Sequence, residues 1–155
     1  MEKDKIIETL NNMGFVLEQR NDFVYAFKYE GLNMLFLYSK DDDEFLNFSL
    51  PNILDTEDES TALCQQLSET LNAGLKYIKA FTINGAVSVF YERENFNENE
   101  DLEELISRII RRLQDAYYFG KAKLNEIKTQ FYKDDDDDDE DDVEDVEDDS
   151  ETKQQ

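Results

Sequence analysis

The residue types that usually carry enzyme chemistry are almost absent from this sequence. Among its 155 residues there is no histidine, and Cys64 is the single cysteine. Without histidine, the chain lacks the base of Ser-His-Asp and Cys-His catalytic sites and the commonest zinc ligand. One thiol cannot build a cluster of thiolate ligands either. The sequence therefore predicts no metal site and no nucleophilic catalysis.

Carboxylates are the one chemical resource in excess, with 39 Asp and Glu residues. Paired carboxylates can serve acid–base catalysis, but among so many acids some pairs lie close by chance. Most of them fall in expected loops, on helix exteriors or in the C-terminal run. The chain also lacks the GxGxxG and GxxxxGKS/T phosphate loops and the GxSxG elbow. We therefore predict a protein that is not an enzyme and uses no cofactor.

The acidic charge is concentrated at the C-terminal end. Residues 134–155 carry 15 acids and one lysine, and residues 1–133 carry 24 acids and 15 bases, within a formal net charge of −23. Such a balance disfavours direct binding to nucleic acid or to an anionic membrane surface. No apolar stretch approaches the about 20 residues of a membrane span. We expect a cytoplasmic protein whose partners are other proteins, and its single cysteine agrees with a reducing compartment.

The elements that must position any site are organised around a predicted hairpin over residues 75–92. Asn84-Gly85 separates two runs of alternating side chains there, and this dipeptide is the strongest short-range hairpin signal. Upstream runs rich in aromatic and branched residues, separated by short turn sequences, predict a β-meander. These runs are residues 15–20, 23–29, 32–39 and 44–50.

Three amphipathic helices complete the expected fold. The first is indicated by apolar residues at helical spacing before a glycine: Ile6, Ile7, Leu10, Met13 and Gly14. The second is predicted to begin at a capping box, Thr56 with Glu59, and to end at Gly74. Cys64 lies on its apolar side, so we expect a buried structural thiol. The order helix, meander, helix, hairpin, helix predicts one α+β domain over residues 1–133, with helices mainly on one sheet face.

The last helix has the longest apolar stripe. It is predicted to begin near Asn99 and to run for about 32 residues, or about 48 Å, which exceeds the width of a domain of this size. Two alternatives remain open. The helix breaks near Gly120, or its end projects and buries apolar side chains against a second subunit in a twofold homodimer. The predicted dimer contacts are Leu124, Ile127 and Phe131.

Residues 134–155 are predicted to be a disordered tail, because a run of acids buries too little apolar surface to offset the entropy of ordering. The run serves either to keep the protein soluble or to bind a basic surface of a partner. It lacks the glycine and the ligand spacing of an EF-hand loop, so we expect no calcium site.

Two-residue turns assign side chains to the two sheet faces. With Glu30-Gly31 as a turn, Ala26 opposes Leu35 on one face, and the neighbouring aromatic residues share the other. We expect the helices to cover the aliphatic face and the aromatic face to bind a partner segment. The alternative is that the aromatic face is ordinary core. The predicted partner-binding residues are Tyr25, Phe27, Phe36, Tyr38, Phe81 and Phe90.

This order of elements resembles the YbjN-type family and the type III secretion chaperone-like fold that it shares. The resemblance covers about residues 2–131 and is carried by the stretches 23–27, 35–38 and 78–91. It implies a non-enzymatic, often dimeric domain of the bacterial cytoplasm that holds an extended or apolar segment of a partner protein. The long acidic tail is not part of the family's pattern. It supports a second hypothesis, a regulatory or charge-mimic protein whose tail binds a basic surface of a partner.

Overall fold

The computed structural model describes the backbone of residues 2–53, 60–94 and 97–154, and the side chains of this part from residue 3 to residue 130. The elements up to the fourth strand are α1 (Glu2–Asn12), β1 (Glu18–Asn21), β2 (Val24–Tyr29), β3 (Leu32–Leu37) and β4 (Phe45–Leu50). They are followed by α2 (Thr61–Gly74), β5 (Ile78–Ile83), β6 (Ala86–Glu94) and α3 (Leu102–Gln154). The predicted α+β class and element order are confirmed.

The strands form one antiparallel sheet in the order β1-β2-β3-β4-β6-β5. The predicted turns hold, because Ala26 pairs with Leu35 across one hairpin and Ala80 with Val89 across the other. Asn84 and Gly85 have φ angles of 51° and 79°, the left-handed values that a type I′ turn requires. Local turn chemistry therefore determines the register of both hairpins.

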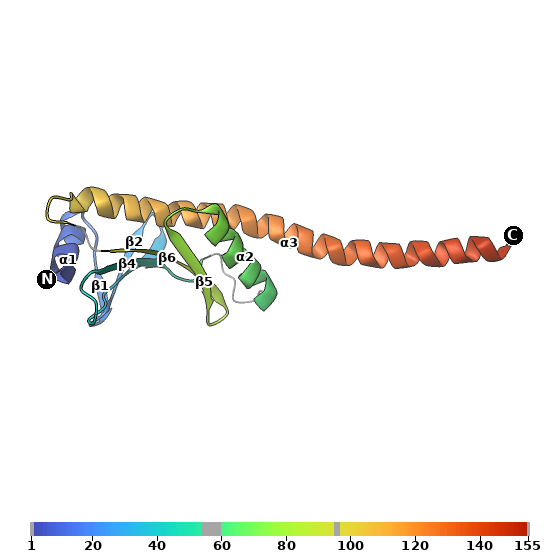
Figure 1. Cartoon of the computed structure of the whole chain (residues 1–155), viewed down its shortest axis with the longest axis horizontal. Coiled ribbons are helices and arrows are strands. Elements are labelled where there is room, and N and C mark those ends of the chain that lie inside the picture. Colours follow the sequence, from blue (N-terminus) through green and yellow to red (C-terminus); the bar gives the residue numbers. More distant parts are fainter. Residues whose placement is uncertain (1, 54–59, 95–96, 155) are drawn as a thin grey trace.

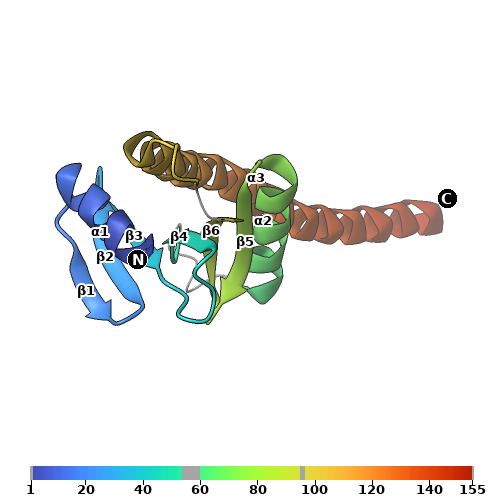
Figure 2. The same ribbon diagram turned by 60° about the vertical axis from the view of Figure 1, so that its left-hand side comes forward.

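All three helices pack on one face of this sheet (Figures 1 and 2). α3 crosses the sheet, α1 lies near β2 and β3, and α2 lies beside β5. Their apolar side chains join one core cluster with one side of the strands. Cys64 of α2, 1% exposed, belongs to this cluster, which confirms the expected buried thiol.

The faces that the helices cover differ from the prediction along β2 and β3. Phe36 pairs with Phe48 of β4, and Phe48 pairs with Tyr91 of β6, so these rings share the helix-covered face with Ala80. Leu35 instead lies on the other face with Ser49 and Phe90. The expectation that all aromatic residues share an uncovered face is therefore corrected. The pairing through β4 joins the aromatic side of one hairpin to the aliphatic side of the other.

α2 begins later than predicted and packs closely on α3. Its N-cap is Ser60, whose hydroxyl accepts a hydrogen bond from the Leu63 amide at 3.2 Å. The predicted capping box of Thr56 and Glu59 lies outside the described residues. At Gly74 a β-carbon would lie 2.6 Å from the Phe119 ring, so a larger residue would require this ring to move.

α3 is continuous, so of the two alternatives left open by the sequence, the break near Gly120 is wrong. It begins at Leu102, not near Asn99, because Asp101 Oδ1 accepts the Glu104 amide at 3.2 Å. Gly120 lies within this helix and is buried. The next apolar residues along the stripe, Leu124 and Ile127, are 7% and 6% exposed and belong to the chain's own core.

Two of the three predicted dimer contacts therefore lie in the core of the chain itself. Leu124 and Ile127 are already covered within the chain and present little surface to a second subunit. The Phe131 side chain lies outside the described residues. Intramolecular burial satisfies the same apolar stripe that suggested an interface.

The acidic run continues α3 to Gln154, so the helix of 53 residues extends beyond the rest of the molecule (Figure 1). The sequence predicted disorder there. A helix already anchored on a core adds residues without a new nucleation cost, and this favours continuation. Like charges three and four residues apart oppose it. The division into a domain of residues 1–133 and a tail of residues 134–155 stays a prediction.

Removing residues 134–155 tests that division. We expect a melting temperature that is unchanged or slightly higher, because the run adds like charge to a domain that is itself acidic. Thermal melts followed by circular dichroism measure this. Replacing Asp134–Asp139 by asparagine is the matched control for charge without loss of length. A fall of several degrees on truncation would show that the run packs on the domain.

The Asn84-Gly85 turn provides a second test. Gly85→Val places a β-branched residue at φ 79°. We expect the free energy of unfolding to fall by about 1 to 3 kcal/mol. Gly85→Asn is the control, because asparagine tolerates this conformation and should cost less. Equal stability of the valine and asparagine variants in urea titrations would contradict the turn assignment.

Candidate functional site

The sheet face opposite the helices is apolar and partly accessible, and we call it the open face. It is formed by side chains from three strands: Leu35 and Leu37 of β3, Phe81 and Ile83 of β5, and Phe90 of β6. Phe81 and Ile83 are 37% and 38% exposed, which is unusual for large apolar residues on a strand. No described helix covers this face.

A hollow of about 370 Å³ lies on the open face. Its walls include Leu35, Leu37 and Ile83, and the polar groups at its base come from Ser49 and Ser88. The two serines are 1% and 2% exposed. Short side chains on the central strands, between longer ones on their neighbours, create this depression. Its chemistry is an apolar wall with a few hydroxyl groups.

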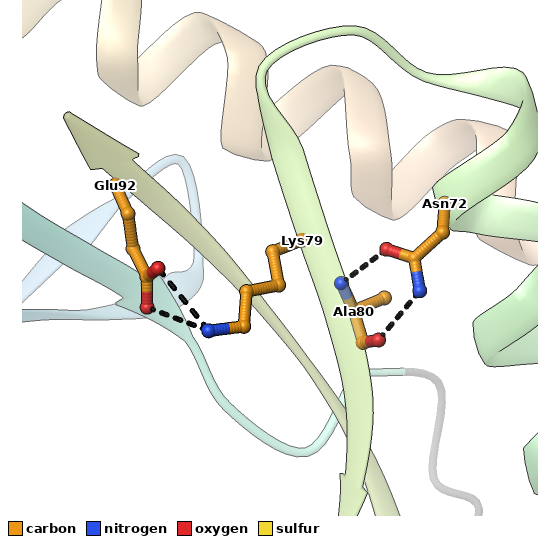
Figure 3. Close-up of polar contacts among 4 residues, drawn as sticks. All are labelled: Asn72, Lys79, Ala80 and Glu92. Carbon is orange, nitrogen blue, oxygen red and sulfur yellow. Dashed lines mark hydrogen bonds and ion pairs between the residues drawn. The ribbon is translucent and has the colours of Figure 1, made fainter.

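An aromatic stack forms the rim of the open face on the side of β5. The rings of Phe81 and Phe90 are stacked with centroids 4.7 Å apart. The Lys79 ammonium lies 5.5 Å from the centre of the Phe81 ring and forms an ion pair of 3.2 Å with Glu92 (Figure 3). The charged pair is largely solvated and contributes little to stability. It limits the apolar surface at this edge.

One polar atom next to the open face has no hydrogen-bond partner among the described residues. It is Oδ1 of Asn47, a buried atom on β4 between Leu37 and Glu92 of the neighbouring strands. Buried acceptors are nearly always satisfied, so an unsatisfied one needs an explanation. A ligand that donates a hydrogen bond at this face would supply one.

The two edges of the sheet differ in accessibility. At the β5 edge, the Asn72 side chain accepts the Ala80 amide at 2.7 Å and donates to the Ala80 carbonyl at 2.8 Å (Figure 3). The carboxamide thus occupies backbone groups that a further strand would use. At the opposite edge, all four residues of β1 are exposed. Only the β1 edge is left without such a side-chain cap among the described strands.

The predicted partner-binding residues are divided between the two faces. Phe81 and Phe90 lie on the open face, where Phe81 is 37% exposed and Phe90, which stacks on it, is 8% exposed. Tyr25, Phe27 and Phe36 are 6%, 3% and 3% exposed and lie in the core under the helices. Because these three rings are covered by the protein itself, the candidate binding site no longer includes them.

Tyr38 is partly buried and packs against the core cluster at the end of β3. Its hydroxyl donates a hydrogen bond of 2.9 Å to Asp43, which raises the pKa of Tyr38 because ionisation would break that bond. The Lys3 ammonium of α1 lies 5.2 Å from the centre of the ring. These contacts tie the end of β3 to the first helix and the acidic loop, which is a structural role.

Sequence reasoning missed Leu35, Leu37, Ser49 and Ser88 as residues of the site. The alternation of β3 was visible, but the loop before β4 is not a two-residue turn. The register between β3 and β4 therefore had no local signal. Short residues in two adjacent strands were the available hint of a depression.

The described residues contain no group of three or more His, Cys, Asp or Glu side chains placed to hold a metal ion. Within the same part of the chain, no helix combines the length and the apolar character needed to cross a membrane.

No protein-family model and no curated protein matches this sequence. Two solved structures share its fold with a TM-score of 0.53. One is an uncharacterized protein from Methanothermobacter thermautotrophicus, 16% identical over 81% of this chain and 98% of that chain. The other is YbjN from E. coli, 11% identical over 81% of this chain and 93% of that chain. The resemblance to the YbjN-type fold is confirmed at the level of the fold.

A third structure has a lower similarity. It is the heterodimeric complex ExoU-SpcU from the type III secretion system of Pseudomonas aeruginosa, with 16% identity over 77% of this chain and 94% of that chain. Its TM-score is 0.46.

The cap on β5 is tested by Asn72→Ala. The variant leaves the edge groups of Ala80 without their side-chain partner, so we expect unfolding in urea to become easier by about 1 to 3 kcal/mol. Asn11→Ala, at an exposed position of α1, is the control and should change stability by less than about 0.5 kcal/mol. Equal effects of the two substitutions would mean that the cap contributes nothing.

Proposed function

We propose that this chain is a non-enzymatic, chaperone-like protein-binding module of the cytoplasm. Its open face holds an extended apolar segment of a partner protein. The observation that carries the proposal is the apolar hollow of about 370 Å³ on a sheet face that none of the three helices covers. A folded protein that leaves such a face accessible normally uses it for binding.

The spacing of the apolar side chains favours an extended segment over a compact ligand. Leu35 and Leu37 are two residues apart on β3, and so are Phe81 and Ile83 on β5. On a strand this spacing is about 7 Å, which matches the distance between side chains on one side of an extended peptide. Alternate apolar side chains of a partner would then meet alternate apolar side chains of the sheet.

Polar groups near the hollow suit a peptide backbone. The hydroxyl groups of Ser49 and Ser88 line the hollow and can accept a hydrogen bond from a partner N–H. Because residues 1–133 carry nine more acids than bases, flanking basic residues in the segment gain from the domain's field. The proposed partner segment is therefore apolar, extended and flanked by lysine or arginine.

The acidic run supports a second candidate, a charge-mimic protein that binds a basic surface of a partner. The observation in its favour is that α3 carries residues 134–154 away from the folded body, where they are accessible (Figure 1). Binding through the run depends on long-range charge and collapses as salt increases beyond about 0.1 M. Binding through the open face buries apolar surface and persists.

The proposal also includes a homodimer, as expected from the resemblance. A standard interface buries about 800 Å² per subunit. Leu124 and Ile127 lie in the chain's own core, so the contact must use another surface.

The open face is tested with reduced insulin as an aggregating substrate. We expect the protein to suppress light scattering of the B chain, and Leu37→Glu with Phe81→Glu to abolish most of this suppression. Val16→Glu is the matched control, because Val16 is 88% exposed outside the open face. Circular dichroism checks that each variant is folded.

Salt separates the two candidates in the same assay. Suppression that persists at about 0.5 M salt, where the Debye length is only a few ångströms, supports the open face. Suppression that is lost there, and also on replacing Asp134–Asp139 by asparagine, supports the charge-mimic candidate. No suppression by the parent protein would contradict the chaperone-like function.

A further inference from the structure

Three arginines form a basic cluster on the exposed side of α3. Arg108, Arg111 and Arg112 are spaced three and four residues apart, so they are neighbours on the helix surface. With Asp115 they line a hollow of about 270 Å³. Like charges three and four residues apart disfavour a helix, and Glu104 and Asp115, each four residues from an arginine of the cluster, offset part of this effect. The cluster is unusual in a chain with a net charge of −23.

Asp115 lies beside the arginine cluster, but none of the three arginines forms an ion pair within the described part of the chain. The ion pairs there are Lys79–Glu92, Arg93–Glu100 and Lys123–Glu126. Arg111 Nε donates only to the Ser107 carbonyl, at 3.3 Å. Arg112 lies 4.8 Å from the centre of the Tyr77 ring. Most guanidinium donors therefore remain available for carboxylates, which they bind in bidentate geometry.

The chain itself contains a matching anion, the nine consecutive acids from Asp134 to Asp142. In the continuous helix α3 this run lies away from the arginines of its own chain. Asp134 follows Arg112 by 22 residues, which corresponds to about 33 Å along the axis. With α3 in this form, the complementary segment comes from a second copy.

In an antiparallel pair of α3 helices, the arginine cluster of each copy can contact the acidic run of the other. If the twofold axis passes near Asn125, positions equally far from it face each other, and Arg111 of one copy faces Asp139 of the other. The same operation brings the acidic run of the first copy to the arginines of the second. Each dimer then contains two identical contacts between an arginine cluster and an acidic run.

The helix surface between the two contacts is available for this pairing. Tyr118, Ala122 and Thr129 follow Arg111 on one stripe at spacings of seven, four and seven residues. All are exposed, and Tyr118, at 57%, is among the most exposed large apolar residues of the described chain. A short side chain at Ala122 permits close approach of two helices.

We propose that Arg108, Arg111 and Arg112 bind the acidic run 134–142 of a second copy, in a homodimer built on antiparallel α3 helices. This contact is separate from the open face, which remains accessible in the dimer. Repulsion between the two acidic chains opposes association, but it acts over longer distances and is screened at about 0.1 M salt. The direct contacts between guanidinium and carboxylate groups are screened less.

Sedimentation velocity at about 0.1 M salt tests the proposal on full-length chains. We expect a dimer in the micromolar range for the parent. The triple variant Arg108→Glu, Arg111→Glu, Arg112→Glu should associate more than about tenfold more weakly. The matched control is Lys5→Glu, Lys40→Glu, Lys76→Glu. It changes the net charge equally at exposed positions outside α3 and should still dimerise.

Charge reversal on the other side completes the test. A chain with Asp134–Asp139 replaced by lysine should also fail to dimerise, because lysines then face arginines. Mixing it with the triple Arg→Glu variant should restore a dimer, since both contacts are again complementary. Circular dichroism confirms that the variants are folded. A monomeric parent, an undiminished dimer of the triple variant, or no restored dimer on mixing would each overturn the proposal.

Discussion

The structure depends on the packing of the apolar stripe of α3 against one face of the sheet. Ile106, Ile109 and Leu113 are fully buried in this contact. α1 and α2 add their apolar side chains to the same cluster, so a single core serves the whole fold. A helix that crosses the sheet determines which side of every strand is interior. The core under the helices therefore contains the aromatic side of β2 and β3 together with the aliphatic side of β5 and β6.

The open face is the side of the sheet on which no described helix packs. Three helices on one side leave Leu35, Leu37, Phe81 and Ile83 without cover, while Ser49 and Ser88 leave a depression between them. Binding and folding therefore use opposite faces of the same strands. This separation lets a partner approach the sheet without disturbing the core. The Asn72 cap on β5 adds protection, because it limits pairing with further strands at that edge.

Charge is also divided along the molecule. The acidic run lies at the far end of α3, and the arginine cluster lies on the same helix over the folded domain (Figure 1). The continuous helix α3 separates these opposite charges along its axis within one chain. Because α3 is long and continuous, the arginine cluster of one chain is available to bind the acidic run of a second copy.

The sequence by itself determined the local features of this protein. Asn84-Gly85 specified a type I′ turn and the register of its hairpin, Glu30-Gly31 did the same for β2 and β3, and the apolar spacing identified three helices. Only the tertiary structure decided which face of each hairpin lies under the helices. The pairing of β4 with β3 and β6 is non-local, and a shift by one residue exchanges the faces without any change in local pattern. The same holds for Leu124 and Ile127, since an apolar stripe does not specify whether its own chain or a second subunit covers it.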